Sequence, residues 1–211
     1  KIKRIVKLIK NEVFAFKIGY EFFLNNGLRG YQEIKKLSPK IFLDLKLHDI
    51  PNTVKEGIKA IEKLKPVMTT VHISGGDEMM KASIINRKKI KILGVSILTS
   101  LDSKQSKKYY SDENIEMLVK KFVKQAYKNE LDGIVCSPKE IKYVRNIVGN
   151  NFIIVTPGIR LNKIQKKNDD QKRTLTPTEA INLGANFLVI GRPITKSKNP
   201  LKTIKEINSS I

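Results

Sequence analysis

The chain has 211 residues, of which 40% are hydrophobic, and a formal net charge of +21. It holds no run near the roughly 20 apolar residues that a membrane span needs, and its basic first residues lead into no secretory signal. The single cysteine, Cys136, excludes an internal disulfide and suits a reducing cytosol. We therefore expect a cytoplasmic protein that folds as one domain over residues 1–211.

The positive charge alone does not predict a nucleic-acid partner. The lysines are spread along the chain, and no aromatic residues interleave with them as platforms for stacked bases. We interpret most of them as solvating helix faces, and their field would also attract an anionic substrate. We expect neither a nucleic-acid nor a membrane partner.

Apolar runs of strand length alternate with segments of helical pattern. The first helical pattern opens the chain, where Ile2, Ile5, Val6 and Ile9 share a face. The runs are short, rich in β-branched or aromatic residues and bounded by turn signals. We predict strands at residues 13–18, 41–46, 67–73, 90–98, 133–136, 152–156 and 187–190.

This alternation predicts the fold class. Strands that alternate with helices indicate a parallel sheet, and nearly continuous apolar strands indicate that both of its faces are covered. Seven strands are one fewer than a closed (β/α)8 barrel, or TIM barrel, requires. We predict an α/β protein of this class whose first strand is missing and would precede residue 1. The polar stretch 158–173 is longer than an ordinary connection. Loops of that length are usually functional lids or disordered, and we predict a lid.

Charged residues end two neighbouring predicted strands. Asp44 and Lys46 are two residues apart, so both should face the barrel interior or its mouth. Lys17 ends the preceding strand, and Asp49 follows Lys46 where the βα loops of such barrels build active sites. Each charge alone is typical of a solvated rim residue, and a buried charge needs a partner and hydrogen bonds. Together they predict one pocket around which two lysines and two aspartates alternate.

The histidines and the cysteine fit structural roles better than catalytic ones. By strand alternation His48 should face away from the Asp44 side. His72 lies in an apolar strand and should be a hydrogen-bonded residue of the barrel interior. Because the two histidines do not cluster with other ligands, a zinc site is not expected. Cys136 ends an apolar run and should be a small buried hydrophobe.

The central motif resembles the signature of orotidine 5'-phosphate decarboxylases, most closely the bacterial type. It runs Asp44-x-Lys46-x-x-Asp49-Ile50-Pro51-Asn52-Thr53, and Pro51 suits the first turn of a helix. The resemblance continues in the family's order and covers nearly the whole chain, from Lys17 to Pro193. Its further motifs are His72-Ile73-Ser74-Gly75-Gly76, Leu98-Thr99-Ser100, residues 155–160, Asp170-Gln171-x-Arg173 and residues 189–194.

The resemblance implies a TIM-barrel enzyme that converts orotidine 5'-phosphate (OMP) to UMP and CO2, the last step of pyrimidine synthesis, without a metal or cofactor. Lys46 would protonate C6 of the pyrimidine, in a charged network with Lys17, Asp44 and Asp49. In a homodimer with shared sites, Asp49 would reach into the partner's site.

The remaining matched positions would bind substrate. Ile50 and Thr53 would cross the dimer interface with Asp49, and Thr99 would contact the pyrimidine. Gln171 would bridge the base and the phosphate. The phosphate end would be served by Arg160, Gly191 and Arg192. The family's first strand also carries an aspartate that binds the ribose, and this chain has no equivalent.

The chemistry of the motif agrees with that activity. A cationic lysine beside C6 stabilises the anion that forms there and can deliver the proton, while Asp44 orients Lys46 and keeps it ionised. One alternative is a Mg²⁺-dependent sugar-phosphate decarboxylase or synthase, which shares the Asp-x-Lys strand. The Ile50–Thr53 run and the loop that carries Gln171 favour the pyrimidine substrate. The alternative from another class is a basic RNA-binding module.

Overall fold

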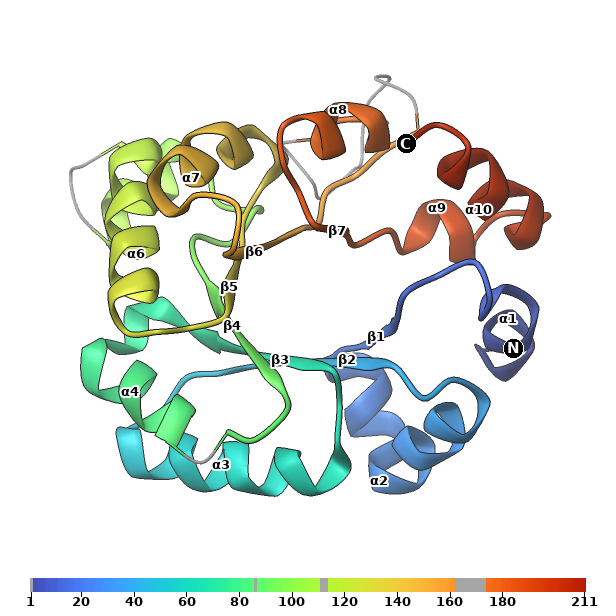
Figure 1. The fold of residues 1–211 in the computed structure, drawn as a ribbon, viewed down its shortest axis with the longest axis horizontal. Helices are drawn as coiled ribbons and strands as arrows, with labels where there is room; N and C mark the ends of the chain where they lie inside the picture. The colour runs from blue at the N-terminus through green and yellow to red at the C-terminus, as the bar shows by residue number, and fades with distance from the viewer. Residues whose placement is uncertain (1, 86, 111–113, 162–173) are drawn as a thin grey trace.

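The protein is described by a computed structural model over residues 2–85, 87–110, 114–161 and 174–211 (Figure 1). Seven parallel strands form one sheet, and each strand pairs with the next along the chain. All seven predicted strands are confirmed, each within a few residues of its expected ends. They are β1 (Phe16–Ile18), β2 (Ile41–Leu47), β3 (Met68–His72), β4 (Lys91–Val95), β5 (Gly133–Val135), β6 (Ile153–Thr156) and β7 (Phe187–Leu188).

Helices connect the strands and cover the outside of the sheet (Figure 1). They are α1 (Ile2–Ile9), α2 (Tyr20–Leu37), α3 (Pro51–Leu64), α4 (Asp77–Ile85), α5 (Ser103–Tyr109), α6 (Ile115–Lys128), α7 (Ile141–Val148), α8 (Pro177–Asn182), α9 (Arg192–Thr195) and α10 (Pro200–Asn208). Two short 3-10 helices are η1 (Ile73–Gly75) and η2 (Pro138–Glu140). None of the helices within these described ranges is long and apolar enough to span a membrane.

The sheet curls so that its two end strands, β1 and β7, approach each other from opposite sides (Figure 1). No hydrogen-bonded pairing joins these two strands within the described residues. Beside them α1 packs against α10, and Ile9 of the first helix belongs to one hydrophobic cluster with Ile204 and Ile207 of the second. The architecture is therefore the predicted TIM barrel with seven of its eight strands.

Local signals fix where several helices begin. Pro51 is the first residue of α3, as predicted, because its missing N–H is not needed there. The side chain of Asn114 accepts a hydrogen bond at the start of α6. Thr176 and Glu179 form a reciprocal capping box at the start of α8. These caps satisfy backbone N–H groups that a helix itself leaves without partners.

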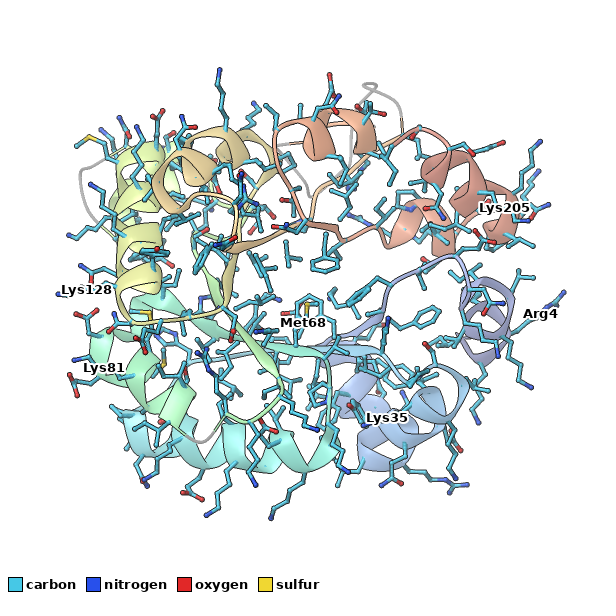
Figure 2. The ribbon with its side chains drawn as sticks, viewed as in Figure 1. Arg4, Lys35, Met68, Lys81, Lys128 and Lys205 are labelled. Atoms are coloured by element: carbon cyan, nitrogen blue, oxygen red, sulfur yellow. The ribbon has the colours of Figure 1, made fainter. Side chains whose placement is uncertain are left out.

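The strands bury side chains on both faces. Phe42, Met68, Leu93 and Val155 point inward and fill the barrel, and Figure 2 shows Met68 at its centre. The alternate side chains, such as Leu43, pack outward against the helices. Each such buried side chain contributes about 1.5–3 kcal/mol relative to exposure. The labelled cationic side chains of Figure 2 lie on the outer helices, as expected for lysines that solvate helix faces.

Candidate active site

A buried carboxylate holds two lysines at the carboxyl ends of the first two strands. Asp44 is only 6% exposed. Lys46 Nζ lies 2.8 Å from both of its carboxylate oxygens, and Lys17 Nζ lies 3.1 Å from Oδ2. The side chains of Lys17 and Lys46 remain 35% and 26% exposed, so they face the barrel mouth. The sequence placed these three residues on one side, and the structure brings them together.

The backbone at Lys46 departs from a regular strand. The pairing of β2 with β3 shifts register between Leu43 and Leu47, and Lys46 has a φ of 44°. A positive φ is uncommon for a residue with a side chain and persists only where its surroundings hold it. The predicted contact between Lys46 and Asp44 therefore forms at a strand irregularity that simple alternation does not describe.

Thr70 of β3 is a site residue that sequence reasoning missed. It is fully buried, and its hydroxyl donates to Asp44 Oδ1 at 2.9 Å. Thr70 Oγ1 in turn accepts the backbone N–H of Lys46 at 2.8 Å. Only its inward position on β3, two residues before His72, could have signalled this role.

The electrostatics favour an ionised Asp44. Burial by itself raises the pKa of this carboxyl, but the charges and hydrogen bonds of Lys46 and Lys17 outweigh burial and hold the pKa below its ordinary value. The hydroxyl of Tyr20 donates to the carbonyl of Leu45. Burial and the nearby Asp44 both raise the pKa of Tyr20, so that it stays protonated. The site thus presents a fixed negative charge between two cations.

His72 is a neutral neighbour of this cluster. Burial, with repulsion by His48 and Lys46, lowers the pKa of His72 to about 4. Its ring centroid lies 5.3 Å from that of His48, which is exposed. The predicted hydrogen bond of His72 is wrong for Nδ1, which is buried without a partner in the described structure. On β4 His72 pairs with Val95, whose apolar side chain offers no hydrogen-bonding group.

Asp49 stands apart from the other three charges. It is exposed, and its carboxylate accepts the backbone N–H of Ile50 at 2.7 Å. Within the described residues it forms no ion pair with a lysine. Ile50 and Thr53 are also exposed. A single chain therefore assembles Lys17, Asp44 and Lys46 but leaves Asp49 outside the cluster.

The other predicted substrate residues follow different strands. Thr99 follows β4, Arg160 follows β6, and Gly191 and Arg192 follow β7, the latter two exposed. Because all strands are parallel, these positions share the rim on which β2 ends. Gln171 and most of the predicted lid 158–173 lie outside the described residues. The backbone N–H of Arg160 bonds to the carbonyl of Leu175, which brings the flanks of that segment together.

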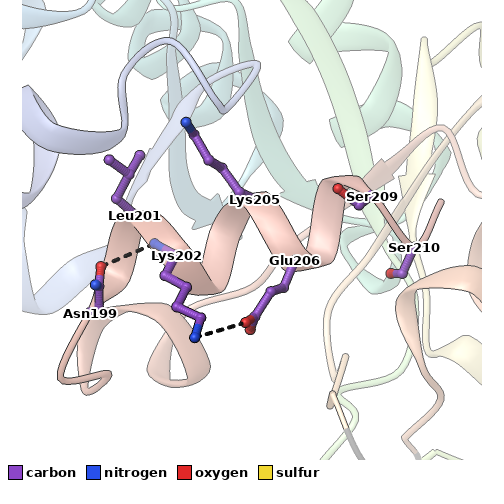
Figure 3. Close-up of a pocket in the computed structure, with 7 residues that line it drawn as sticks. All are labelled: Asn199, Leu201, Lys202, Lys205, Glu206, Ser209 and Ser210. Carbon is purple, nitrogen blue, oxygen red and sulfur yellow. Dashed lines mark hydrogen bonds and ion pairs between the residues drawn. The ribbon is translucent and has the colours of Figure 1, made fainter.

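Surface hollows lie elsewhere. The hollow in Figure 3 is lined by residues of α10 and its flanks, among them Leu201, Lys202, Glu206 and Ser209. None of the site residues lines it. In the ranges that the structure describes, no three His, Cys, Asp or Glu side chains cluster as metal ligands would.

Fold and site together define a class of protein. A parallel barrel that gathers a buried carboxylate and two ammonium groups at the carboxyl ends of its strands has the architecture of a TIM-barrel enzyme. The family model described as "Orotidine 5'-phosphate decarboxylase / HUMPS family" matches residues 1–207, and the chain belongs to this family. The predicted resemblance is thereby confirmed.

Individual relatives support the same family assignment. The chain is 45% identical to an orotidine 5'-phosphate decarboxylase of Wolbachia pipientis over 205 residues, which cover 96% of this chain and 89% of the relative. It is 44% identical to that of Ehrlichia canis, with coverages of 99% and 91%. The crystal structure of orotidine 5'-phosphate decarboxylase from Lactobacillus acidophilus superposes with a TM-score of 0.84 at 33% identity and covers 99% of this chain and 92% of that one.

Proposed function

We propose that the protein decarboxylates OMP to UMP and CO2 without a metal or an organic cofactor. The single observation that carries this proposal is the Lys46–Asp44–Lys17 cluster at the barrel mouth, in a chain of this family. The bond between C6 and the carboxylate breaks, CO2 leaves, and the electron pair stays on C6. The ammonium of Lys46 then gives its proton to C6, and the resulting amine regains a proton from solvent.

Each charge in the cluster has a task in this reaction. The ammonium of Lys46 stabilises the negative charge as it develops on C6, because a cation that Asp44 already holds in place needs little reorganisation as that charge forms. Asp44 orients that ammonium with both carboxylate oxygens. The ammonium of Lys17 lies against the Asp44 carboxylate and helps to keep that carboxylate ionised. The cluster is therefore arranged before substrate binds.

The rim residues bind the rest of the substrate. Thr99 contacts the pyrimidine, and Gln171 links the base to the phosphate. Arg160, Gly191 and Arg192 bind the phosphate, for which the guanidinium groups offer paired N–H donors. The location of Thr99, Arg160, Gly191 and Arg192 after β4, β6 and β7 supports their assignment. Phosphate binding contributes energy that the transition state uses, although the phosphate does not react.

We further propose a homodimer in which Asp49 completes the partner's site. Ile50 is 67% exposed, and Tyr20 and Leu24 of α2 are 52% and 79% exposed. The hydrogen bond from Tyr20 to Leu45 ties the start of α2 to the strand that precedes Ile50. Exposed apolar side chains beside a charged site favour burial against a second copy. Asp49, which is exposed and pairs with no lysine among the described residues, suits a shared site.

A spectrophotometric assay of OMP decarboxylation with and without EDTA tests the proposal. We expect the same rate in both, because the site supplies its charge from side chains. Loss of turnover in EDTA, restored by Mg²⁺, would instead favour a metal-dependent sugar-phosphate enzyme. Absence of OMP turnover under either condition would refute the proposed activity.

A further inference from the structure

Thr70 connects the two residues on which the charged cluster depends. It lies in β3, is 0% exposed, and faces the barrel interior together with His72. Its hydroxyl donates to Asp44 Oδ1 and accepts from the backbone N–H of Lys46. A threonine hydroxyl has one proton to donate, and here that proton goes to the buried carboxylate.

Both hydrogen bonds restrain groups that would otherwise move. Asp44 Oδ1 already accepts from Lys46 Nζ, so the Thr70 hydroxyl fixes the plane of the carboxylate from a second direction. The backbone of Lys46 has its φ of 44° where the strand pairing shifts register. An N–H that is shielded from water and has no partner is costly, and Thr70 supplies the partner for the partly buried N–H of Lys46. The hydroxyl thus holds both the side-chain anchor and the main chain of Lys46.

We propose that Thr70 is a positioning residue that aims the ammonium of Lys46 at the reacting carbon by holding Asp44 and the Lys46 backbone together. The proposal rests on the proposed function of Lys46 as the proton donor. Thr70 itself exchanges no proton with the substrate. Its effect reaches the reaction only through the two residues that its hydroxyl contacts.

The neighbouring Thr69 is a matched control. It is also 0% exposed, and its hydroxyl donates one buried hydrogen bond, 2.8 Å long, to the carbonyl of Leu43. It points to the opposite face of β3, and within the described residues its hydroxyl bonds to Leu43 and not to Asp44, Lys46 or Lys17. Replacing either threonine with valine keeps the side-chain shape and removes one buried hydroxyl. A general loss of stability affects both variants, whereas misalignment of Lys46 affects only the Thr70→Val variant.

The kinetic test compares Thr70→Val, Thr70→Ser and Thr69→Val in OMP decarboxylation. We expect Thr70→Val to lower kcat roughly tenfold to a hundredfold, with KM changed less than about threefold, because the lost alignment matters in the transition state. Thr70→Ser retains the hydroxyl and should recover most of kcat. Thr69→Val should keep wild-type kcat. If Thr70→Val does not fold, Thr70→Cys replaces it, since a thiol is a weak donor.

A titration of the Asp44 carboxyl carbon by NMR gives a readout that needs no turnover. The groups that face this carboxylate are Lys17 of β1, Lys46 of β2 and, more distantly, Tyr20 and His72. Loss of the Thr70 hydroxyl removes a hydrogen bond to the charged form, so Thr70→Val should raise the pKa of Asp44 while Thr69→Val leaves it unchanged.

The two readouts separate the two proposals. Equal kcat and equal Asp44 titration in Thr70→Val and Thr69→Val would overturn the role of Thr70. A wild-type protein that does not decarboxylate OMP would overturn the proposed function. In that case, an Asp44 pKa that is raised in Thr70→Val and unchanged in Thr69→Val would still show that Thr70 positions Asp44.

Discussion

The two aspartates of the central motif lie in opposite environments, although they are only five positions apart in the chain. Asp44 is buried and contacts Lys17, Lys46 and Thr70, which lie on three adjacent strands. Asp49 is exposed on the loop after β2 and accepts one hydrogen bond, from the N–H of its own neighbour Ile50. The difference indicates that one chain builds a rigid half of the site on its strands. In the proposed homodimer the loop half, with Asp49, would contact a second chain.

Removing the ammonium of Lys46 from the rigid half should have the largest effect on activity. We expect Lys46→Ala to lower kcat by at least about a thousandfold, because it removes both charge stabilisation and proton delivery. Circular dichroism should show that the fold is retained. Lys128→Ala, at the exposed end of α6, is the matched control and should keep wild-type kcat. Near-normal turnover by Lys46→Ala would remove Lys46 from the role of proton donor.

Mixing two inactive variants tests whether the loop half serves another chain. Asp49→Ala and Lys46→Ala should each be inactive alone. If Asp49 completes the partner's site, a heterodimer has one site with neither change, and an equal mixture should recover about a quarter of wild-type activity. Native mass spectrometry would confirm that subunits have exchanged. No recovery after confirmed exchange would show that each site is built within one chain.

The buried environment should also make stability depend on pH through His72. Its pKa is lowered to about 4 from 6.5, so the unfolded chain binds more protons between these values. Stability is therefore complete above about pH 6.5 and falls as the pH drops toward 4, by roughly 3 kcal/mol for a fully buried group and by roughly 2 kcal/mol once solvent screening of this partly exposed ring is included. Urea unfolding across this range should show that His72→Asn removes most of this decline. An unchanged decline would assign it to other groups.

Asp44 affects stability in a lower pH window. Its pKa lies below the ordinary 3.8, so the stability it contributes is present above pH 3.8 and is lost as the pH falls through the lower folded value. The His72 window can therefore be measured with Asp44 still ionised.

The smallest effect should come from the loop aspartate. Asp49→Asn should change the free energy of unfolding by less than about 0.5 kcal/mol, because an exposed carboxylate with one local hydrogen bond contributes little. Asp44→Asn should destabilise by several times more, since it leaves two lysines without their anion. Urea unfolding at neutral pH and fixed protein concentration compares the two. Equal losses would contradict the difference in their environments.

Local patterns in the sequence were enough to predict the fold and to identify the charged residues at the barrel mouth. The seven apolar runs became the seven strands, and Pro51 begins α3 as expected. The two-residue spacing of Asp44 and Lys46 placed both side chains at the barrel mouth, and Lys17 joined them from the preceding strand. Strand alternation and helix-start signals depend on residues close together in the chain, so a single sequence is sufficient to reveal them.

The contacts between strands were decided only by the tertiary structure. Whether Thr70 meets Asp44, or His72 meets the apolar Val95, depends on the register between strands, which residues far apart in the chain set together. The positive φ of Lys46 likewise follows from the register shift against β3 and not from any preference of lysine. Sequence alone thus identified the charges of the site, whereas packing between strands determined which groups hold them in place.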